Sequence, residues 1–266
     1  MTASSAERDL LRQVDAALGE RRAAVPVART TVGERLVAVE LDGPETGMGV
    51  AHRPPGDTDL RPPETAGDLS RWAFEPPADD PVAASLGIAA LNARSVGAID
   101  WTSGDPMAML DPGVNRIATV GLFRAAFRKF DDVEVRVIER EPVGALDPPE
   151  GVSVRVFGPE GAEDALSSID LLFVTGSALL YGGLLRYLRL AADGPKVVMI
   201  GATASFLPGP VFEAGVDVVA GARVTDVGRV RSAIEGGACG TDLHGEGLEK
   251  VFVTDGHEPG KLTLED

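Results

Sequence analysis

Two short segments of the chain combine glycine with hydroxyl side chains, and each directly follows an apolar run. The segments are Thr175-Gly176-Ser177, after residues 169–174, and Gly201-Ala202-Thr203, after residues 196–200. Glycine lets a ligand approach the backbone closely, and a hydroxyl group can donate or accept a hydrogen bond. The pattern favours binding of a polar or anionic group. Ser177 lacks the Gly-x-Ser-x-Gly surroundings of a hydrolase nucleophile, so we assign it no catalytic role.

A glycine and an acidic residue occupy the positions at which dinucleotide-binding folds contact a nucleotide. Gly121 follows one apolar run and Glu139 ends the next. An acid at the end of the second strand can accept hydrogen bonds from ribose hydroxyls or from ring N–H groups. The Gly-x-Gly-x-x-Gly fingerprint is interrupted by Leu122 and Phe123, so a standard NAD site is not expected. A plain strand-to-helix turn at Gly121 and a solvated charge run around Glu139 remain the alternatives.

Asn92 is a polar residue in an otherwise apolar helix of small residues, predicted over 82–96. A buried amide requires hydrogen-bond partners. Asn92 is therefore expected either to be a satisfied core amide or to point into the cleft between the domains.

Residues that could bind a metal ion are few and scattered. The three histidines lie at positions 52, 244 and 257, without metal-binding spacing, and Cys239 is the only cysteine. A single cysteine excludes an internal disulfide and a thiolate metal site within one chain. Histidines and carboxylates from distant segments would have to assemble any metal site, so exposed or structural histidines are the simpler interpretation.

The spacing of apolar residues predicts the elements that position these groups. Leucines 180, 184 and 188 recur every four residues between the two hydroxyl-bearing segments, which predicts a helix joining two buried strands. Such βαβ units are right-handed, so both segments should lie at the carboxyl edge of one parallel sheet. Strand and helix patterns alternate from 116 to 235, including a helix marked by phenylalanines 123, 127 and 130. An α+β part with a capping box, Ser4-x-x-Glu7, precedes them.

Composition limits the classes of partner. The formal charge is −16, and only 4 of the 25 basic residues are lysine, which is typical of proteins from salt-rich cytoplasm. No basic face is visible that could neutralise nucleic-acid phosphates. No apolar run approaches 18 residues and no signal peptide is recognisable, so we expect a halophilic, cytoplasmic protein without membrane or nucleic-acid partners.

Several stretches together resemble one family of two-domain proteins, the putative heavy-metal chelation family. They span most of residues 5–236 and are Gly87–Ala93, Val120–Phe123, Ile138–Arg140, Val174–Ser177, Gly215–Asp217 and Ala220–Gly221. The resemblance implies an enolase-like α+β domain before a Rossmann-like α/β domain, and a ligand site in the cleft between them. Tyr181, where asparagine is expected, and residues 201–204, where Gly-Pro-Ser-Thr is expected, depart from the family pattern.

We therefore predict an α/β fold in three parts: an enolase N-terminal-like α+β domain with linker at 1–112, a Rossmann-like domain at 113–240, and a C-terminal tail at 241–266, in which 250–254 could add an edge strand. The predicted ligand-binding residues are Asn92, Gly121, Glu139, Thr175, Gly176, Ser177, Gly201 and Thr203. The resemblance implies a heterocycle or a metal-bearing small molecule as ligand, although one cysteine and scattered histidines are poor ligands for soft metals. A nucleotide or S-adenosylmethionine-type cofactor and a non-catalytic scaffold are the alternatives, and a homodimer is an option.

Overall fold

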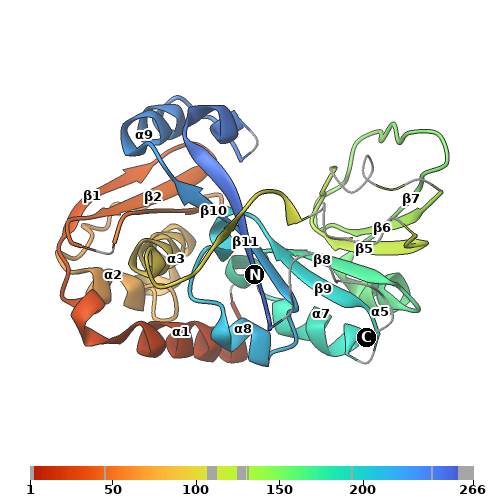
Figure 1. Cartoon of the computed structure of the whole chain (residues 1–266), viewed down its shortest axis with the longest axis horizontal. Helices are drawn as coiled ribbons and strands as arrows, with labels where there is room; N and C mark the ends of the chain where they lie inside the picture. The colour runs from red at the N-terminus through yellow and green to blue at the C-terminus, as the bar shows by residue number, and fades with distance from the viewer. Residues whose placement is uncertain are drawn as a thin grey trace.

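A computed structural model of the protein describes residues 3–44, 46–106, 113–124, 130, 132–192, 194–240 and 242–256. Part of the predicted linker, most of the predicted phenylalanine-marked helix, His257 and the end of the predicted tail lie outside these residues. The described chain forms two sheets with helices packed against them (Figure 1). None of the helices found among these residues has the length and hydrophobicity needed to span a bilayer.

The N-terminal part is a small antiparallel sheet packed against helices. Its elements are α1 (Ser5–Ala23), β1 (Val27–Val32), β2 (Leu36–Leu41), β3 (Met48–His52), α2 (Ala66–Arg71), η1 (Pro77–Asp79) and α3 (Pro81–Ser95). The predicted capping box begins α1, because the Ser4 backbone N–H donates to Glu7 and the Glu7 N–H donates to the Ser4 hydroxyl. Helix α3 is buried along almost its whole length, and it contacts both β2 and β3.

The second part is a sheet of eight strands. Its elements are β4 (Thr102–Ser103), β5 (Arg116–Val120), β6 (Glu134–Ile138), β7 (Ser153–Phe157), η3 (Pro159–Gly161), α5 (Ala162–Leu166), β8 (Leu171–Thr175), α6 (Ala178–Tyr181), α7 (Leu184–Ala191), β9 (Lys196–Ile200), η4 (Ala202–Ala204), α8 (Gly209–Glu213), β10 (Val218–Val224), α9 (Val227–Glu235), η5 (Asp242–Glu246) and β11 (Leu248–Thr254).

The order of these strands is β4-β11-β10-β9-β8-β5-β6-β7, and the six strands from β10 to β7 are parallel. Among the parallel strands the chain runs outward from β5 to β7, and then returns to β8 on the other side of β5. The carboxyl ends of β5 and β8 thus flank the topological switch point, where open α/β sheets bind ligands. Strand β11 comes from the segment predicted as a tail, and it lies antiparallel between β10 and β4. The predicted α/β class, with an α+β part before a Rossmann-like sheet, is confirmed.

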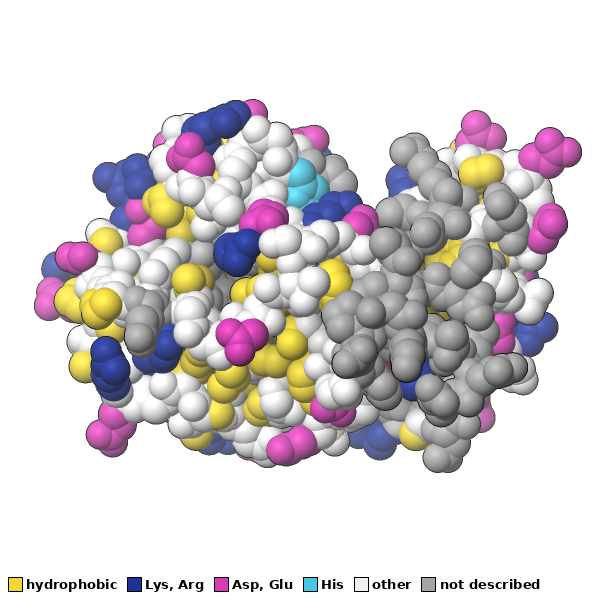
Figure 2. Space-filling view, viewed as in Figure 1, with side chains coloured by type: hydrophobic (Ala, Val, Ile, Leu, Met, Phe, Trp, Pro, Cys, Tyr) yellow, Lys and Arg dark blue, Asp and Glu magenta, His cyan; other side chains and the backbone are white. Residues whose placement is uncertain are grey.

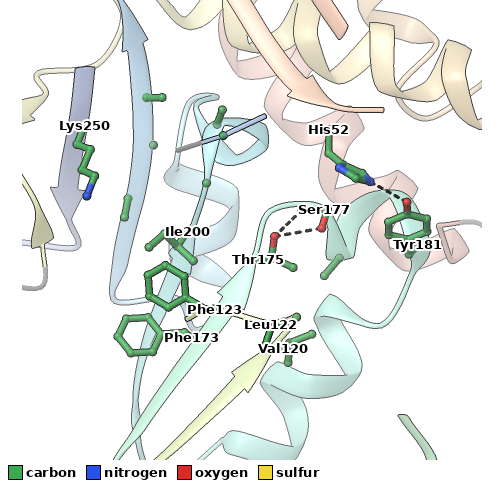
Figure 3. A pocket seen from close by; sticks show the side chains of 18 of the residues that line it. His52, Val120, Leu122, Phe123, Phe173, Thr175, Ser177, Tyr181, Ile200 and Lys250 are labelled. Atoms are coloured by element: carbon green, nitrogen blue, oxygen red, sulfur yellow. Dashed lines mark hydrogen bonds between the residues drawn. The ribbon is translucent and has the colours of Figure 1, made fainter. Parts of the chain in front are cut away.

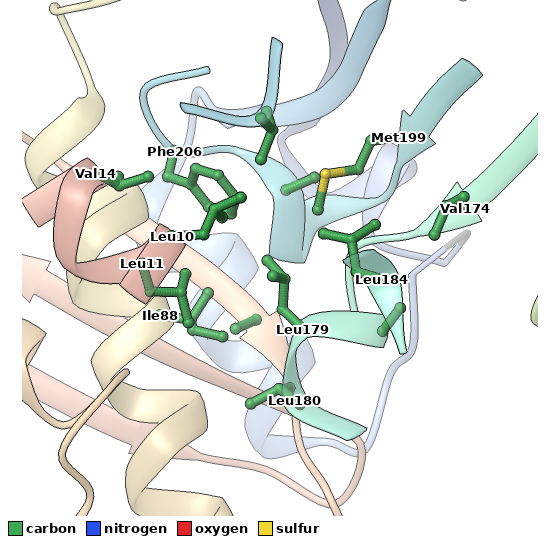
Figure 4. Packing of buried hydrophobic residues seen from close by; sticks show 14 of the residues in the cluster. Leu10, Leu11, Val14, Ile88, Val174, Leu179, Leu180, Leu184, Met199 and Phe206 are labelled. Carbon is green, nitrogen blue, oxygen red and sulfur yellow. The ribbon is translucent and has the colours of Figure 1, made fainter. Parts of the chain in front are cut away.

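One hydrophobic core joins the two parts. Side chains of α1 and α3, such as Leu11 and Ile88, meet side chains that follow or belong to the large sheet, such as Leu179 and Met199 (Figure 4). On the other side of the small sheet, Arg231 of α9 forms two hydrogen bonds with the Glu40 carboxylate of β2, at 2.7 and 2.6 Å. The large sheet is therefore packed against the α+β part through an apolar core and a bidentate ion pair.

Charged side chains of both signs are dispersed over the face of the molecule drawn in Figure 2. The dark blue basic side chains are spread over this face, among magenta acidic ones, and form no extended patch there. Across the described residues many of them pair with nearby acids, as Arg8 does with Asp79 and Arg12 with Glu75.

A cluster of three arginines around Glu134 predicts how stability depends on pH. The carboxylate of Glu134 on β6 accepts hydrogen bonds from Arg136, Arg116 and Arg155, at 2.9, 3.1 and 3.4 Å. The contacts from Arg136, first of all, and from Arg116 lower the pKa of Glu134 from 4.5 to about 2. A depressed pKa stabilises the fold above the unfolded-state value, and this contribution is lost as the pH falls towards 2.

We expect Glu134→Gln to lower the free energy of unfolding by about 1 kcal/mol at pH 7, since solvent screens part of the interaction. The difference from the wild type should shrink as the pH falls from 4.5 to 2. Urea unfolding of both proteins at pH 7, 4 and 2.5 measures it. An equal difference at all three pH values would contradict the assignment.

Candidate functional site

A cavity of about 760 Å³ lies at the carboxyl edge of the large sheet. Its lining comes from the ends of the parallel strands and the loops that follow them, from β11, and from His52 at the end of β3. Five further lining residues lie outside these segments: Arg35, Asp105, Pro106, Gly240 and His244. Figure 3 shows these side chains from close by. Five of the predicted site residues line the cavity: Gly121, Glu139, Thr175, Ser177 and Gly201. The structure therefore brings most of the predicted residues to one place.

The two hydroxyl groups after β8 are hydrogen-bonded to each other. Thr175 Oγ1 and Ser177 Oγ lie 3.1 Å apart, and the Ser177 backbone N–H also donates to Thr175 Oγ1. Two hydroxyl groups carry two hydrogens, and one of these is used between them. The pair can therefore donate one further hydrogen bond into the cavity that both residues line.

Glu139 shapes the loop that follows β5. One carboxylate oxygen accepts the Leu122 backbone N–H at 3.0 Å, and the other accepts the Arg140 backbone N–H at 2.9 Å. Gly121 in that loop has a φ of +90°, a conformation that L-residues rarely adopt. Each oxygen of Glu139 keeps a second lone pair, so the residue can hold the loop and still accept a hydrogen bond from a ligand.

Three predicted site residues do not line the cavity. The Asn92 amide donates to the carbonyls of Val50 and Ala202, at 2.8 and 3.0 Å, and is 2% exposed. Thr203 is also buried, and its hydroxyl accepts the His52 backbone N–H at 2.9 Å. Gly176 lies against the Ala204 backbone, where a Cβ would come within 2.8 Å of the Ala204 nitrogen. These residues join α3, β3 and the η4 loop behind the cavity wall.

Several lining residues were not predicted from the sequence, and His52 and Tyr181 are the most prominent. His52 Nε2 lies 2.8 Å from Tyr181 Oη, and the two rings meet at 57° (Figure 3). The guanidinium of Arg140 stacks over the Tyr181 ring, 3.4 Å from its centroid. Burial, helped by the charge of Arg140, lowers the pKa of His52, so its imidazole is neutral at pH 7.

The position of Tyr181 could have been predicted in part. It follows Ser177 by four residues, so it lies one helical turn beyond a predicted site loop. His52 gave no such signal, because it ends a strand of the other sheet and is 129 residues away in the chain.

The far side of the cavity is more apolar. Phe123 and Phe173 pack with ring centroids 5.3 Å apart, and Ile200 lies beside them (Figure 3). Beyond this apolar part, Lys250 of β11 pairs with Asp105 at 2.8 Å. The cavity thus has a polar end at Tyr181 and an apolar floor at the phenylalanines, as expected of small-molecule sites.

The described residues do not fit a metal centre made by the protein alone. Within them, no three His, Cys, Asp or Glu side chains come together as a ligand set. The Cys239 thiol lies 3.4 Å from the Asp242 carboxylate, and burial together with this hydrogen bond raises the pKa of Cys239. A protonated thiol is a weak metal ligand.

Comparison with known proteins places the chain in a family. No match was found among curated proteins. Two family profiles match adjoining parts of the chain, and both families are described as putative heavy-metal chelation. The DUF364 profile matches residues 106–253, and the DUF4213 profile matches residues 15–95. The chain is similar in structure to a DUF364-family protein with unknown function from Pyrococcus horikoshii, with 19% identity and a TM-score of 0.76 over 92% of this chain and 100% of that one.

A second DUF364-family protein with unknown function, from Desulfitobacterium hafniense, is 17% identical with a TM-score of 0.72 over 93% of this chain and 98% of that one. At these identities the likeness shows the fold alone. The predicted family is confirmed by the profile match, which covers more than half of the sequence. The chain belongs to the DUF364 family, described as putative heavy-metal chelation.

Proposed function

We propose that this protein binds a small molecule in the cavity at the carboxyl edge of its large sheet. The observation that carries the proposal is the cavity itself, which lies beside the topological switch point and has a volume of about 760 Å³. Ligand pockets of proteins commonly enclose roughly 300–1,000 Å³. Its combination of an aromatic floor and a polar end suits a ligand with a flat apolar part and a polar group. A pure scaffold would have no need of such a space.

For the ligand class, we propose a heterocycle or a metal chelate, meaning a metal ion that arrives with organic donor atoms of its own. The family description supports a link to metals. The described residues offer no group of three protein ligands. A protein that recognises a metal complex by its shape and polarity agrees with both the family description and the lack of protein ligands. In such a complex the organic part supplies the donor atoms that bind the metal.

A nucleotide-type cofactor is the second candidate. The parallel strands follow the order found in dinucleotide-binding folds, and Glu139 ends the second of them. Against this candidate, Leu122 and Phe123 interrupt the Gly-x-Gly-x-x-Gly fingerprint at the first of these strands.

Thermal unfolding with a ligand panel tests the proposal. The panel contains Ni²⁺ alone, 1,10-phenanthroline, its Ni²⁺ complex and adenosine, each in concentrated KCl. A bound ligand at 100 times its Kd adds about 2.7 kcal/mol, or a rise of about 5 °C or more in Tm. We expect the flat heterocycle or its complex to raise Tm and Ni²⁺ alone to leave it unchanged. A rise with adenosine only would favour the second candidate.

Ile200→Trp links any binding to the cavity, because the larger ring fills the space beside Phe123 and Phe173. We expect this variant to lose the ligand-dependent rise in Tm. Leu190→Trp is the matched control, since Leu190 is exposed on α7 and does not line the cavity. Equal responses of both variants to the ligand would contradict the proposed site.

A further inference from the structure

We infer that the ligand of this cavity carries an oxyanion, either a carboxylate or a phosphate, which Arg140 binds at the polar end beside Tyr181. The inference rests on the proposed function, because it names the class of ligand for the same cavity. Three observations carry it: the charge of Arg140, the way in which it is held, and the hydrogens that the groups around it can still donate.

The positive charge of Arg140 is not balanced by a carboxylate within the part of the chain that the structure describes. Its neighbour Glu139 keeps a negative charge nearby, but both oxygens of Glu139 are directed to backbone N–H groups and form no ion pair with the guanidinium. Lys250 at the other end of the cavity is neutralised by Asp105. Arg35 also lines the cavity, and the side chains of both arginines are exposed. The guanidinium of Arg140 is therefore free to form an ion pair with an anionic group of a ligand.

Arg140 is also held in a fixed place. Its guanidinium stacks on Tyr181, and Tyr181 is hydrogen-bonded to His52. The backbone of His52 is fixed on both sides, because its N–H donates to Thr203 and its carbonyl accepts from the Ser85 hydroxyl. Stacking engages the face of a guanidinium and leaves the N–H groups at its edge free to donate, which is the geometry that binds carboxylate and phosphate.

The groups around Arg140 have hydrogens left to donate. A neutral His52 and Tyr181 together carry two polar hydrogens, and the contact between them uses one, whichever tautomer is present. Thr175 and Ser177 likewise keep one hydrogen after their mutual bond. With the N–H groups of the guanidinium, these hydrogens can be donated to one ligand group, which suits a group that only accepts. With the aromatic floor, the ligand class is an amphipathic organic anion.

Two flat probes of equal size test this assignment, 2-naphthoate and its neutral analogue 2-naphthamide, titrated calorimetrically at one fixed ionic strength. We expect the wild type to bind the carboxylate at least tenfold more tightly than the amide. Arg140→Met keeps the side-chain length and removes the charge, so it should bring the affinities for the carboxylate and the amide within about twofold of each other. Arg189→Met is the control and should retain the preference, because Arg189 lies on the exposed face of α7 and does not line the cavity.

The outcomes separate the inference from the proposed function. A wild-type preference below twofold, or a preference that survives Arg140→Met, would overturn the anion assignment while leaving the cavity as the site. Binding of both probes to Ile200→Trp with wild-type affinity would overturn the proposed site itself. Binding of neither probe to the wild type at millimolar concentration would overturn the assignment of an aromatic anion, and the heterocycle panel would then decide the proposed function separately. Inorganic phosphate, added as a competitor of 2-naphthoate, distinguishes the two oxyanions. Displacement of the carboxylate at millimolar phosphate would indicate a phosphate site, and no displacement a carboxylate site.

A measurement without ligand tests whether Arg140 lies at the polar end of the cavity. Because Arg140 helps to lower the pKa of His52, Arg140→Met should raise that pKa, measured from the imidazole ring signals by NMR. It should still stay below the ordinary value of 6.5, since burial is the larger cause. An unchanged pKa would show that the guanidinium does not lie at the polar end in solution.

Discussion

Asn92→Asp is expected to destabilise the protein by about 4 kcal/mol at pH 7, although the two side chains have nearly the same volume. The amide nitrogen of Asn92 donates to the carbonyl oxygens of Val50 and Ala202. It also lies 3.5 Å from the carbonyl oxygen of Thr203. Aspartate would replace this donor with an oxygen facing three carbonyl oxygens. The side-chain oxygen of Asn92, Oδ1, already lacks a hydrogen-bond partner among the described residues. The new negative charge of aspartate would therefore be buried without compensation.

Urea unfolding monitored by circular dichroism measures the cost, and Asn115→Asp is the matched control. Asn115 is the other asparagine of the chain, and it is exposed. We expect the control to change the free energy of unfolding by roughly 0.5 kcal/mol or less, as is usual for surface substitutions. The cost of Asn92→Asp should fall as the pH is lowered, because protonation removes the buried charge. A loss below 1 kcal/mol at pH 7 would mean that the amide does not bridge β3 and the η4 loop.

The same geometry gives Asn92 a structural position that its sequence context left open. The sequence predicted either a satisfied core amide or a group pointing into a cleft. In the structure Asn92 connects α3 to β3 and to the loop after β9, and the other face of that loop borders the cavity through Gly201 and Ala202. Its effect on a ligand would therefore be indirect, through the position of the wall.

Local patterns were sufficient to predict which loops meet at the edge of the large sheet. Gly121, Glu139 and Thr175 each lie at the carboxyl end of a strand whose apolar run is visible in the sequence. Parallel strands joined by helices must place such ends at one edge, so the chain order alone brings them together. The α/β class could be predicted for the same reason.

Contacts between distant segments could not be predicted in this way. His52 meets Tyr181 only because β3 of the small sheet packs beside the η4 loop of the large one. The stacking of Arg140 on Tyr181 depends on a backbone turn set by Glu139. The position of β11 in the sheet could not be predicted from the pattern of alternating strands and helices, because an antiparallel strand that returns to the sheet is not part of that pattern. The polar end of the cavity was therefore visible only in the folded chain.

Gly49→Ala is expected to cost about 3–5 kcal/mol, because β3 and α3 are packed backbone to backbone at this position. A Cβ at Gly49 would lie 2.1 Å from the Ala89 carbonyl oxygen and 2.4 Å from the Ala93 nitrogen. Neither atom belongs to a side chain that could turn aside, so the strand or the helix must move. The small residues of α3 allow the close approach, and a single added methyl group removes it.

Moving β3 would also displace the cavity wall, since His52 ends that strand and contacts Tyr181. We therefore expect Gly49→Ala to weaken binding of 2-naphthoate as well as to lower Tm, even though Gly49 does not line the cavity. Gly209→Ala is the control, because a Cβ there meets nothing within 4 Å, and it should leave both properties nearly unchanged. Wild-type stability of Gly49→Ala would mean that α3 and β3 lie farther apart than the structure places them. A large loss of stability with unchanged affinity in the remaining folded protein would show instead that the wall at His52 does not depend on this packing.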